Sequence, residues 1–489
     1  MLKVTRPPSL GAKQEAFAYQ IAAVEAIRNL EFAAIFHEQG LGKTKIGVDL
    51  ALLWLSTDVV DSVLIITKKS LIQNWREELH FHTHIIPRVL DHDSQGNFYA
   101  FNSPIRVYLT NYEVLRSEEK RFRLFLKTRR VAAILDEAHK IKNPNASITK
   151  ALFRLAPGFV RRVIMTGTPV ANRPYDLWAQ IFFLDQGKAL GTDFAAFRSD
   201  LDLTNDMWRD NEKARAFEEQ LALVFDRIRE FTVRETKKNA GIALPDKELR
   251  NILVDLEDRQ AEIYARYRDD LAATVVHEGR ALLDDAEEIL KRLLRLVQVA
   301  SQPALVDDSY HATPGKAFVL DQLVHGITDG GEKVIVWTCF TENVDWIARM
   351  LDDVGAVRVH GKRSIDERNR AIKAFKEDTA HKVLVATPAS AKEGLTLTVA
   401  NHAIFYDRSF SLDDYLQAQD RIHRISQEKP CFVTNLVARH TVDEWIELLL
   451  AAKELTAHLA QGDITKSEFQ RSISYDFGAI IKQVLGIEE

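Results

Sequence analysis

The sequence predicts an α/β fold that contains two parallel sheets joined by a mostly helical stretch. Short runs of aliphatic and β-branched residues alternate with amphipathic stretches between residues 32 and 165, and the alternation returns between residues 333 and 407. Such continuous apolar runs are typical of strands in parallel sheets, which helices cover on both faces. From about residue 184 to residue 305 these runs stop, and apolar residues recur at helical spacing instead.

The length and composition of the chain are those of an ordinary globular protein with more than one domain. A chain of 489 residues exceeds what one hydrophobic core usually supports, so we expect two or more domains. Hydrophobic residues make up 46% of the chain and charged residues 28%. Because the formal net charge is −5, any contact with a polyanion must come from local basic patches.

The cysteine usage and the apolar stretches indicate a protein of a reducing compartment. Cys339 and Cys431 lie far apart in the sequence and form no CxxC pair, so neither a zinc site nor a disulfide framework is supported. The longest apolar stretch, residues 50–55, is too short to span a bilayer, and the first ten residues lack an apolar signal region. We therefore expect a cytoplasmic protein with no membrane partner.

The first strand, residues 32–36, leads into the stretch HEQGLGKT at residues 37–44, and a helical pattern at residues 45–55 follows. A strand, a glycine-rich turn that ends in Gly-Lys-Thr, and a helix form a phosphate-binding loop. The glycines let backbone N–H groups approach phosphates, and the start of the helix presents its positive dipole end to them. The sequence therefore predicts a nucleotide site.

Each residue of this loop has an expected role. Lys43 would reach the β- and γ-phosphates, and the Thr44 hydroxyl would bind Mg²⁺. His37 departs from the strict pattern, which has glycine at that position. Gln20, about twenty residues upstream, would place its amide on a purine edge, unless it is a surface residue on a packing helix. The loop residues expected around the phosphates are Gln39, Gly40, Leu41 and Gly42.

A second acidic motif follows one of the later strands of this region. Further strands are expected at residues 62–67, 106–112, 131–135 and 162–165. The strand at 131–135 ends in Asp136 and Glu137, which is the Walker B arrangement. The strand would hold Asp136 beside the metal, and Glu137 would project toward the water that attacks the γ-phosphate. The alternative is that both acids only cap the following helix.

The second region carries a pair of arginines beyond its last expected strand. Its strands are expected at residues 333–338, 357–360, 382–387 and 403–407. Gln417, Arg421 and Arg424 fall at i, i+4 and i+7, on one face of a predicted helix. Two arginines on one face suit a γ-phosphate that gathers charge during transfer. The alternative is a surface ladder of salt bridges.

In chain order, these motifs resemble those of the Swi/Snf-type DNA translocases of helicase superfamily two. The resemblance covers residues 18 to about 446. The most specific segment is QAQDRIHRISQ at residues 417–427, because a QAxDRxHRxxQ helix is close to a signature of that family. The other matching segments are HEQGLGKT (37–44), LDEAH (135–139), MTGTPVAN (165–172) and TPASAKEGLTLTVANHAIFYD (387–407).

The resemblance implies two RecA-like lobes, with ATP and Mg²⁺ in the cleft and double-stranded DNA across both lobes. Gln20 would then read adenine, and Arg421 and Arg424 would act as arginine fingers from the second lobe. Gly394 and Gln417 would complete the nucleotide site. The residues implied to couple nucleotide and DNA are His139, Thr166 and Thr168. The positions implied near the DNA track are Lys68, Ser70, Thr110, Thr387 and Lys392.

Some positions depart from the family pattern. Lys68 stands where proline is common, Ser426 replaces a glycine, and Glu235 replaces an arginine. The form Gly-Leu-Thr-Leu-Thr at residues 394–398 looks more like the fork-remodelling and strand-annealing branch than like the nucleosome remodellers. A minimal bacterial or phage member of the family is the expectation that fits these departures.

The sequence thus predicts a motor with tandem lobes. The expected divisions are a first lobe at 1–184, a helical insertion at 185–310, a second lobe at 311–452 and a helical tail at 453–489. The expected function is sequence-independent movement along double-stranded DNA, driven by ATP hydrolysis without obligatory strand separation. One alternative is a helicase that separates DNA or RNA strands. Another is a DNA-binding clamp without turnover, which would have no need of the complete set of nucleotide-site residues.

Overall fold

The computed structural model describes residues 9–170, 173–201, 211–241, 244–278, 286–390, 396–424, 426–464 and 468. These residues fall into two units. The first comprises residues 1–202, 217–242 and 456–466, and the second comprises residues 203–216, 243–455 and 467–489. Each unit is built on one parallel sheet, as the sequence predicts.

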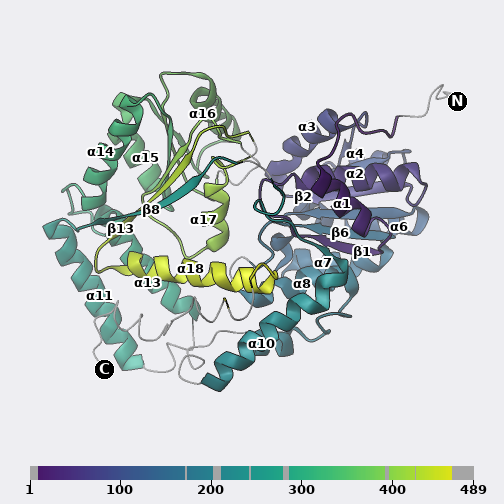
Figure 1. Ribbon diagram of the computed structural model, residues 1–489, viewed down its shortest axis with the longest axis horizontal. Helices are drawn as coiled ribbons and strands as arrows, with labels where there is room; N and C mark the ends of the chain where they lie inside the picture. The colour runs from purple at the N-terminus through teal and green to yellow at the C-terminus, as the bar shows by residue number, and fades with distance from the viewer. Residues whose placement is uncertain are drawn as a thin grey trace. The chain divides into compact units, whose positions relative to one another are not determined.

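The first unit has a seven-stranded sheet in the order β3-β4-β2-β5-β6-β1-β7, and every neighbouring pair is parallel (Figure 1). The strands are β1 (Phe32–Ile35), β2 (Ser62–Thr67), β3 (Arg88–Val89), β4 (Val107–Asn111), β5 (Val131–Asp136), β6 (Arg161–Met165) and β7 (Thr232–Val233). The five strands expected in this region are confirmed. The phosphate-loop stretch leaves β1, and Asp136 is the last residue of β5, so both lie at the carboxyl ends of strands.

Helices cover this sheet because its strands are apolar on both faces. The helices of this unit are α1 (Ala18–Ile27), α2 (Lys43–Ser56), α3 (Ile72–His82), α4 (Ser94–Phe101), α5 (Tyr112–Ser117), α6 (Glu119–Thr128), α7 (Ser147–Leu155), α8 (Trp178–Asp185), α9 (Phe194–Leu201) and α10 (Asn211–Ile228), and the first six residues of α10 belong to the second unit. Trp54 and Trp75 anchor α2 and α3 in a core that also holds Ile65 of β2. α8 lies against β1 and β6, and α7 packs between α5 and α8.

The second unit has a six-stranded parallel sheet in the order β10-β11-β9-β12-β13-β8. Its strands are β8 (Lys247–Val254), β9 (Val334–Trp337), β10 (Ala356–Val359), β11 (Val383–Ala386), β12 (His402–Phe405) and β13 (Cys431–Ala438). Its helices are α11 (Asp258–Glu278), α13 (Ala286–Ser301), α14 (Gly315–Asp329), α15 (Thr341–Met350), α16 (Ile365–Glu377), α17 (Leu412–Gln419) and α18 (Val442–Ala460). The four strands expected here, β9 to β12, are confirmed.

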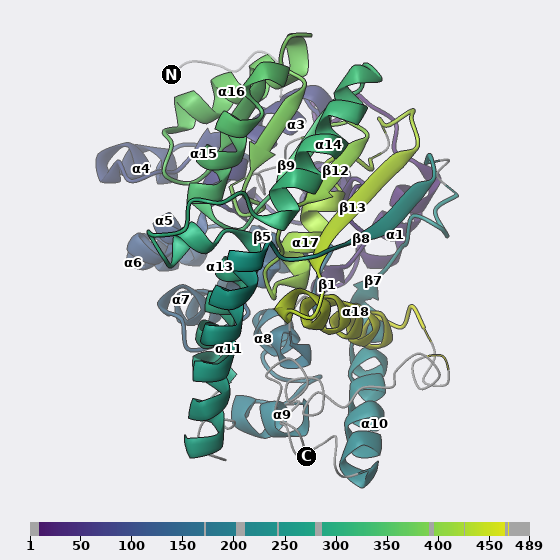
Figure 2. The same ribbon diagram turned by 90° about the vertical axis from the view of Figure 1, so that its left-hand side faces the viewer.

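Four strands were not predicted from the sequence, and one of them is the two-residue strand β3. β7 and β8 interrupt the stretch that was expected to be helical, and β13 follows the arginine segment. β8 lies at the edge of the second sheet beside β13 (Figure 2). Its sequence, KELRNILV, carries four charged or amide side chains because one edge of the strand faces solvent, and most of its residues are exposed. An exposed edge strand lacks the apolar run by which the buried strands are recognised.

The predicted helix through Gln417, Arg421 and Arg424 is wrong beyond its first residue. α17 ends at Gln419, and the described residues after it form turns. The carbonyl of Arg421 accepts a hydrogen bond from the backbone of Leu397 at 3.0 Å. In a continued helix, this carbonyl would accept a hydrogen bond from a residue of the same helix, but here a distant residue donates to it. The two arginines therefore share no helix face with Gln417.

Helices of the central stretch pack as core, as their apolar stripe predicts. Leu293 and Val297 of α13 are buried with Tyr264 of α11. The sequence predicts an apolar stripe that begins at Leu282 and includes Leu294, but Leu294 is 39% exposed. Leu282 and Leu283, with which the stripe begins, lie outside the described residues. Among the described residues, no helix has the length and apolar character needed to cross a bilayer.

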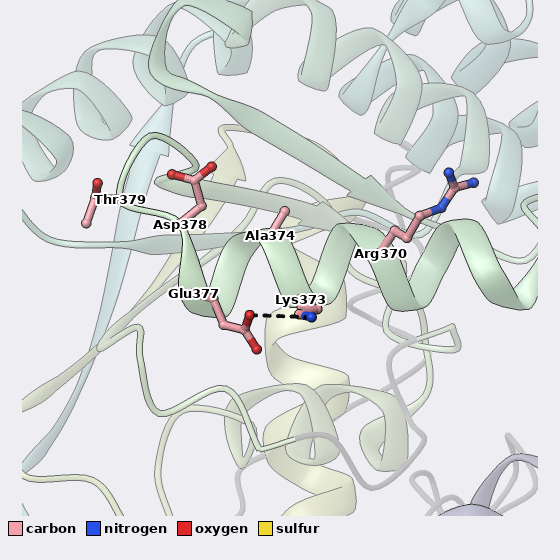
Figure 3. Close-up of a pocket in the computed structure, with 6 residues that line it drawn as sticks. All are labelled: Arg370, Lys373, Ala374, Glu377, Asp378 and Thr379. Atoms are coloured by element: carbon pink, nitrogen blue, oxygen red, sulfur yellow. Dashed lines mark ion pairs between the residues drawn. The ribbon is translucent and has the colours of Figure 1, made fainter.

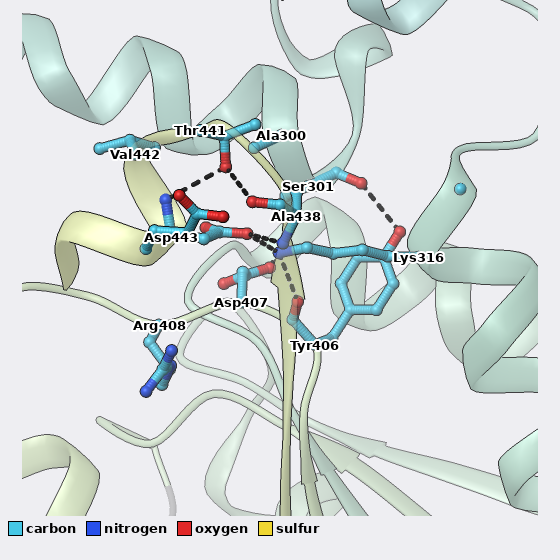
Figure 4. A network of polar contacts seen from close by, with 12 residues as sticks. Ala300, Ser301, Lys316, Tyr406, Asp407, Arg408, Ala438, Thr441, Val442 and Asp443 are labelled. Carbon is cyan, nitrogen blue, oxygen red and sulfur yellow. Dashed lines mark hydrogen bonds and ion pairs between the residues drawn. The ribbon is translucent and has the colours of Figure 1, made fainter. Parts of the chain in front are cut away.

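A buried polar network joins α14, β12 and α18 within the second unit (Figure 4). Lys316, at the start of α14, is 1% exposed and forms an ion pair with Asp443. Its ammonium also donates to the carbonyl of Tyr406 at 3.1 Å. Asp407 accepts from the hydroxyls of Ser301 at 2.7 Å and Thr338 at 2.6 Å. The network fixes the carboxyl end of β12 to three helices and a neighbouring strand.

Candidate active site

The loop between β1 and α2 has the backbone that a phosphate site requires. Gly40 has a φ of 86° and Gly42 a φ of 65°, both in the left-handed region that side chains disfavour. Gly42 is the residue that precedes α2. A Cβ at Gly42 would lie 2.5 Å from Nε2 of Gln20, so another residue there would have a strained backbone and would displace the Gln20 amide.

Lys43 is held over the loop by backbone carbonyls. Its ammonium donates to the carbonyl of His37 at 3.0 Å and to that of Glu38 at 3.3 Å. Gly167, in the loop after β6, faces the same group, because a Cβ there would lie 3.1 Å from Nζ of Lys43 and 2.4 Å from Cγ of Gln39. The MTGTP segment therefore packs directly on the phosphate loop, and only a glycine fits at the contact.

Two of the predicted coupling residues lie in this same segment. Thr166 is fully buried, and its backbone N–H donates to the carbonyl of Ile35 at 3.1 Å. Its hydroxyl accepts from the backbone of Thr168 at 3.2 Å. The structure thus ties both threonines to the end of β1, where the phosphate loop begins.

Gln20 lies against the loop, with both ends of its amide bonded to backbone. Nε2 donates to the carbonyl of Leu41 at 3.3 Å, and Oε1 accepts from the backbone of Phe17 at 2.9 Å. The side chain is 3% exposed, so it is not the surface glutamine of the alternative interpretation. Its described contacts support the loop, and its contact with adenine stays a prediction.

His37, the departure from the strict loop pattern, is 2% exposed. Burial, with the nearby charges of Lys43 and Arg234, lowers the pKa of His37 to about 4. The imidazole is therefore neutral near pH 7 and adds no charge beside the lysine. Its ring lies 6.1 Å from that of Tyr19, whose hydroxyl donates to the carbonyl of Leu41 at 3.2 Å.

Asp136 is oriented by two donors from outside its own strand. Oδ2 accepts from the indole N–H of Trp75 at 2.8 Å and from the hydroxyl of Thr67 at 3.1 Å. Oδ1 accepts from the backbone of Glu137 at 3.0 Å. Burial and the neighbouring Glu137 raise the pKa of Asp136 to about 6, although the two donors and Lys43 act in the opposite direction. Lys43 of the phosphate loop is thus one of the charges that act on Asp136.

Trp75 is a site residue that the sequence analysis missed. The sequence places Trp75 with Leu71 and Ile72 in a predicted helix, and α3 buries it to 1% exposure. The indole N–H nevertheless points at the carboxylate that we expect to hold the metal. A buried tryptophan usually finds a partner for its N–H, which is the signal that could have prompted a search for an acceptor.

Glu137 is held in an unusual backbone conformation. Its φ of 54° and ψ of 50° lie in the left-handed region, where a glutamate is strained. Oε2 lies 3.1 Å from Nδ1 of His139, and Nε2 of the same ring lies 2.8 Å from Nζ of Lys68. Burial would raise the pKa of Glu137, but His139, Lys68 and Lys43 together hold it well below its usual range. The glutamate is therefore ionised, as a proton acceptor must be.

The structure brings the arginine segment to the described part of the Gly-Leu-Thr-Leu-Thr segment. Nη1 of Arg424 donates to the hydroxyl of Thr396 at 3.1 Å, and Arg421 is 4% exposed. Gln417 donates to Asp413 on its own helix at 2.7 Å. Gly394, predicted at the nucleotide, lies outside the described residues.

The residues predicted near DNA divide into three groups. Thr110 is fully buried, and its hydroxyl donates to the carbonyl of Leu90 at 3.2 Å, so a DNA contact from this side chain is not supported. Thr387 is 6% exposed and donates to Ser390. Lys68 and Ser70 are partly exposed after β2. Lys392 lies outside the described residues.

A separate hollow on α16 carries none of this chemistry (Figure 3). Lys373 on its wall lies 3.8 Å from Glu377, one turn further along the helix. Two basic and two acidic side chains line it, and no predicted site residue does. The nucleotide-site residues of the first unit are the better candidate.

Comparison with known proteins gives the family. Residues 19–305 match the model of the SNF2-related domain, and residues 315–426 match that of the helicase conserved C-terminal domain. The first match alone covers more than half of the chain, so the chain belongs to the SNF2-related family. This confirms the resemblance found in the motifs.

The chain is similar to proteins of bacteria and eukaryotes. An uncharacterised ATP-dependent helicase of Mycoplasma pneumoniae is 29% identical over 89% of this chain and 41% of its own length. The human SWI/SNF-related matrix-associated actin-dependent regulator of chromatin subfamily A member 1 is 26% identical over 84% of this chain and 40% of its own length. The chain thus spans about 40% of the length of these curated relatives.

A solved structure, the Sulfolobus solfataricus SWI2/SNF2 ATPase core in complex with dsDNA, aligns over the whole of both chains. It is 26% identical in sequence, and the TM-score is 0.43. The SWI2/SNF2 ATPase core domain from the same organism covers 96% of this chain, at 24% identity and a TM-score of 0.41.

Proposed function

We propose that the chain hydrolyses ATP and uses the energy to move along double-stranded DNA without obligatory strand separation. The observation that carries the proposal is the convergence of Lys43, Asp136 and Glu137 at the carboxyl ends of β1 and β5, where the charge of Lys43 acts on both carboxyls. Membership of the SNF2-related family supports the same conclusion.

The residues of the loop fit a nucleotide with Mg²⁺. Gly40 and Gly42 leave the loop backbone open to phosphates, and Lys43 lies over its carbonyls. Thr44 and Asp136 offer the hydroxyl and carboxylate oxygens that Mg²⁺ prefers. When bound, the metal would neutralise phosphate charge. Glu137, ionised and held by His139, would accept the proton of the attacking water.

Arg421 and Arg424 would supply charge to the γ-phosphate during transfer. Their assignment comes from the family resemblance, and Gln417 and Gly394 would accompany them. The contact between Arg424 and Thr396 supports it, because it holds one guanidinium on a neighbouring motif of the same unit. Both arginines lie in turns beyond α17, so they do not share a helix face with Gln417.

For DNA we propose sequence-independent contacts with phosphates. No module that reads bases is evident in the motifs, and a motor must bind everywhere along its track. Lys68 is the best placed of the predicted contacts, since its ammonium also meets His139 beside Glu137. The link from Lys68 to Glu137 through one imidazole offers a short path between DNA and the hydrolytic site.

One experiment tests the proposal. ATP hydrolysis is measured in parallel without nucleic acid, with duplex DNA, with single-stranded DNA and with RNA, and Glu137→Gln serves as the inactive control. We expect duplex DNA to give the greatest stimulation. No hydrolysis under any condition would contradict the ATPase, and stimulation by RNA alone would contradict the DNA motor.

A strand-separating helicase is the second candidate function. The match of residues 315–426 to the helicase C-terminal domain and the helicase relatives favour it. Displacement of a labelled strand from a tailed duplex, at the rate of ATP hydrolysis, would support this candidate against the translocase.

A further inference from the structure

The segment after α18 contributes a carboxylate to the first unit. α18 begins within the second unit, whereas residues 456–466 belong to the first. There the segment is tightly packed: Gly462 has a φ of 73°, and a Cβ at this position would lie 2.6 Å from Cε1 of Phe225. Leu459, Ala460 and Gln461 are buried beside it. The turn that carries Asp463 is thereby fixed on the unit that holds the phosphate loop.

Asp463 binds Arg234 through both of its oxygens. Nε of Arg234 donates to Oδ1 at 3.0 Å, and Nη2 donates to Oδ2 at 2.5 Å. The two side chains are 13% and 10% exposed. Burial would raise the pKa of Asp463, but His458, 3.0 Å away, and Arg234 lower it. The pair is therefore ionised, bidentate and largely shielded from water, the arrangement in which such bonds are strongest.

The remaining arm of Arg234 reaches the start of the phosphate loop. Nη1 donates to the carbonyl of Phe36, the residue between β1 and HEQGLGKT. On the same stretch, the backbone of Phe36 donates to the carbonyl of Val233 at 2.9 Å. The backbone of Glu38 donates to the carbonyl of Glu235 at 2.8 Å. The backbone hydrogen bonds that pair β1 with β7 thus continue beyond the end of β1. The bond from Arg234 to the carbonyl of Phe36 holds this stretch in place from a side chain as well.

This fixed backbone presents the carbonyls that hold the catalytic lysine. The carbonyls of His37 and Glu38, which directly follow Phe36, accept from Nζ of Lys43 at 3.0 and 3.3 Å. Movement of Phe36 would therefore shift both acceptors of Lys43. A short chain of contacts connects the Asp463 carboxylate to the lysine that we propose to bind phosphate.

We propose that Asp463 is a positioning residue for the phosphate-binding loop, acting through Arg234 on the carbonyl of Phe36. The inference rests on the proposed function of the loop. Without the carboxylate, Arg234 would be a buried cation with no countercharge, close to Lys43 and His37. We expect the guanidinium then to turn toward water and to release Phe36.

The test compares three variants of the full chain. Asp463→Asn keeps the shape of the side chain but removes its charge, and Arg234→Lys keeps the charge but cannot contact the carboxylate and Phe36 in the same way. Glu119→Gln is the matched control, because Arg154 binds Glu119 through two bonds of 2.8 and 2.6 Å between α6 and α7. The dissociation constant of fluorescently labelled ADP is measured well below the melting temperature of each variant.

We expect Asp463→Asn and Arg234→Lys each to weaken binding of labelled ADP by roughly tenfold, the effect of one charge-assisted hydrogen bond. Glu119→Gln should leave it within about twofold, as for an exposed pair. The double variant should be no weaker than either single variant, since both remove the same link.

Each outcome bears on the inference. If Asp463→Asn lowers the melting temperature but binds ADP like the wild type, the turn is structural and the inference is wrong. If Asp463→Asn does not fold, Arg234→Lys decides by the same criterion. If the wild-type protein binds no labelled ADP, the proposed function of the loop fails, and this inference fails with it.

Discussion

The two units each hold a buried cluster of carboxylates and cations, and the clusters differ in how fully their groups are bonded. In the second unit, Asp407 accepts from two hydroxyls, from Asn343 at 3.2 Å and from the backbone of Cys339 at 2.6 Å. In the first unit, Asp136 and Glu137 are adjacent, Glu137 has a strained backbone, and its charge raises the pKa of Asp136.

This difference in bonding suggests a structural role for the cluster of the second unit and a reactive role for that of the first. In the network around Lys316 and Asp407, each of the three buried charges of Lys316, Asp407 and Asp443 has a partner, so the network stabilises one arrangement. In the first unit, two adjacent carboxylates repel each other and Glu137 has a strained, left-handed backbone, so unfavourable interactions remain. A bound Mg²⁺ would offset the repulsion between the carboxylates, which is why we propose that the chemistry takes place in the first unit.

The largest expected effect comes from Arg421, a second-unit cation that is nearly as buried as Lys316. If its charge serves phosphoryl transfer, Arg421→Ala should reduce DNA-stimulated ATP turnover by about 10³-fold or more, the range of arginine fingers. Affinity for ATP without DNA should change little. Turnover is measured at saturating duplex DNA. If the variant is stimulated as strongly as the wild type, Arg421 has a structural role and does not act in phosphoryl transfer.

Glu137→Gln should slow ATP hydrolysis by roughly 10²- to 10⁴-fold, because the amide keeps the shape but cannot accept a proton. Nucleotide binding and the melting temperature should stay close to wild type. Single-turnover hydrolysis and ADP titration measure the two properties separately. Equal losses of binding and hydrolysis would contradict the role of Glu137 as base.

Lys316→Met should give the opposite pattern. Removal of one partner leaves Asp443 buried without its countercharge, so we expect the free energy of unfolding to fall by about 3–5 kcal/mol. Labelled ADP should still bind the first unit with wild-type affinity. Denaturant unfolding measures the first effect, and a selective loss of ADP affinity would show that the network is not merely structural.

Trp75→Phe should have the smallest of these effects. The ring keeps its packing but loses the N–H that orients Asp136, and loss of such a supporting donor typically costs roughly 10- to 100-fold in metal affinity or activity. The Mg²⁺ concentration for half-maximal hydrolysis should rise, while the melting temperature changes little. Tyr112→Phe is a matched control, since its hydroxyl donates to the backbone carbonyl of Asp136 rather than to the carboxylate.

Much of the fold and of the first-unit site could be predicted because short patterns determine local backbone geometry. Apolar runs located nine of the strands, and Gly40 and Gly42 marked the loop whose positive φ angles only glycine adopts readily. Asp136 and Glu137 followed a buried strand, so their place at its carboxyl end was determined by sequence order. β8 was not predicted because it is an exposed edge strand that carries polar residues.

The sequence by itself determined the positions of nine strands along the chain, the phosphate loop and the identity of the acidic pair. Only the tertiary structure decided which distant groups support them. Trp75 meets Asp136 across 61 positions, and Asp463 meets Arg234 across 229. The backbone N–H of Leu397 also donates to the carbonyl of Arg421, at a position where a helix was expected to continue. The physical reason is that hydrogen bonds between distant residues depend on where packing places each donor and acceptor, and no local spacing in the chain records that position.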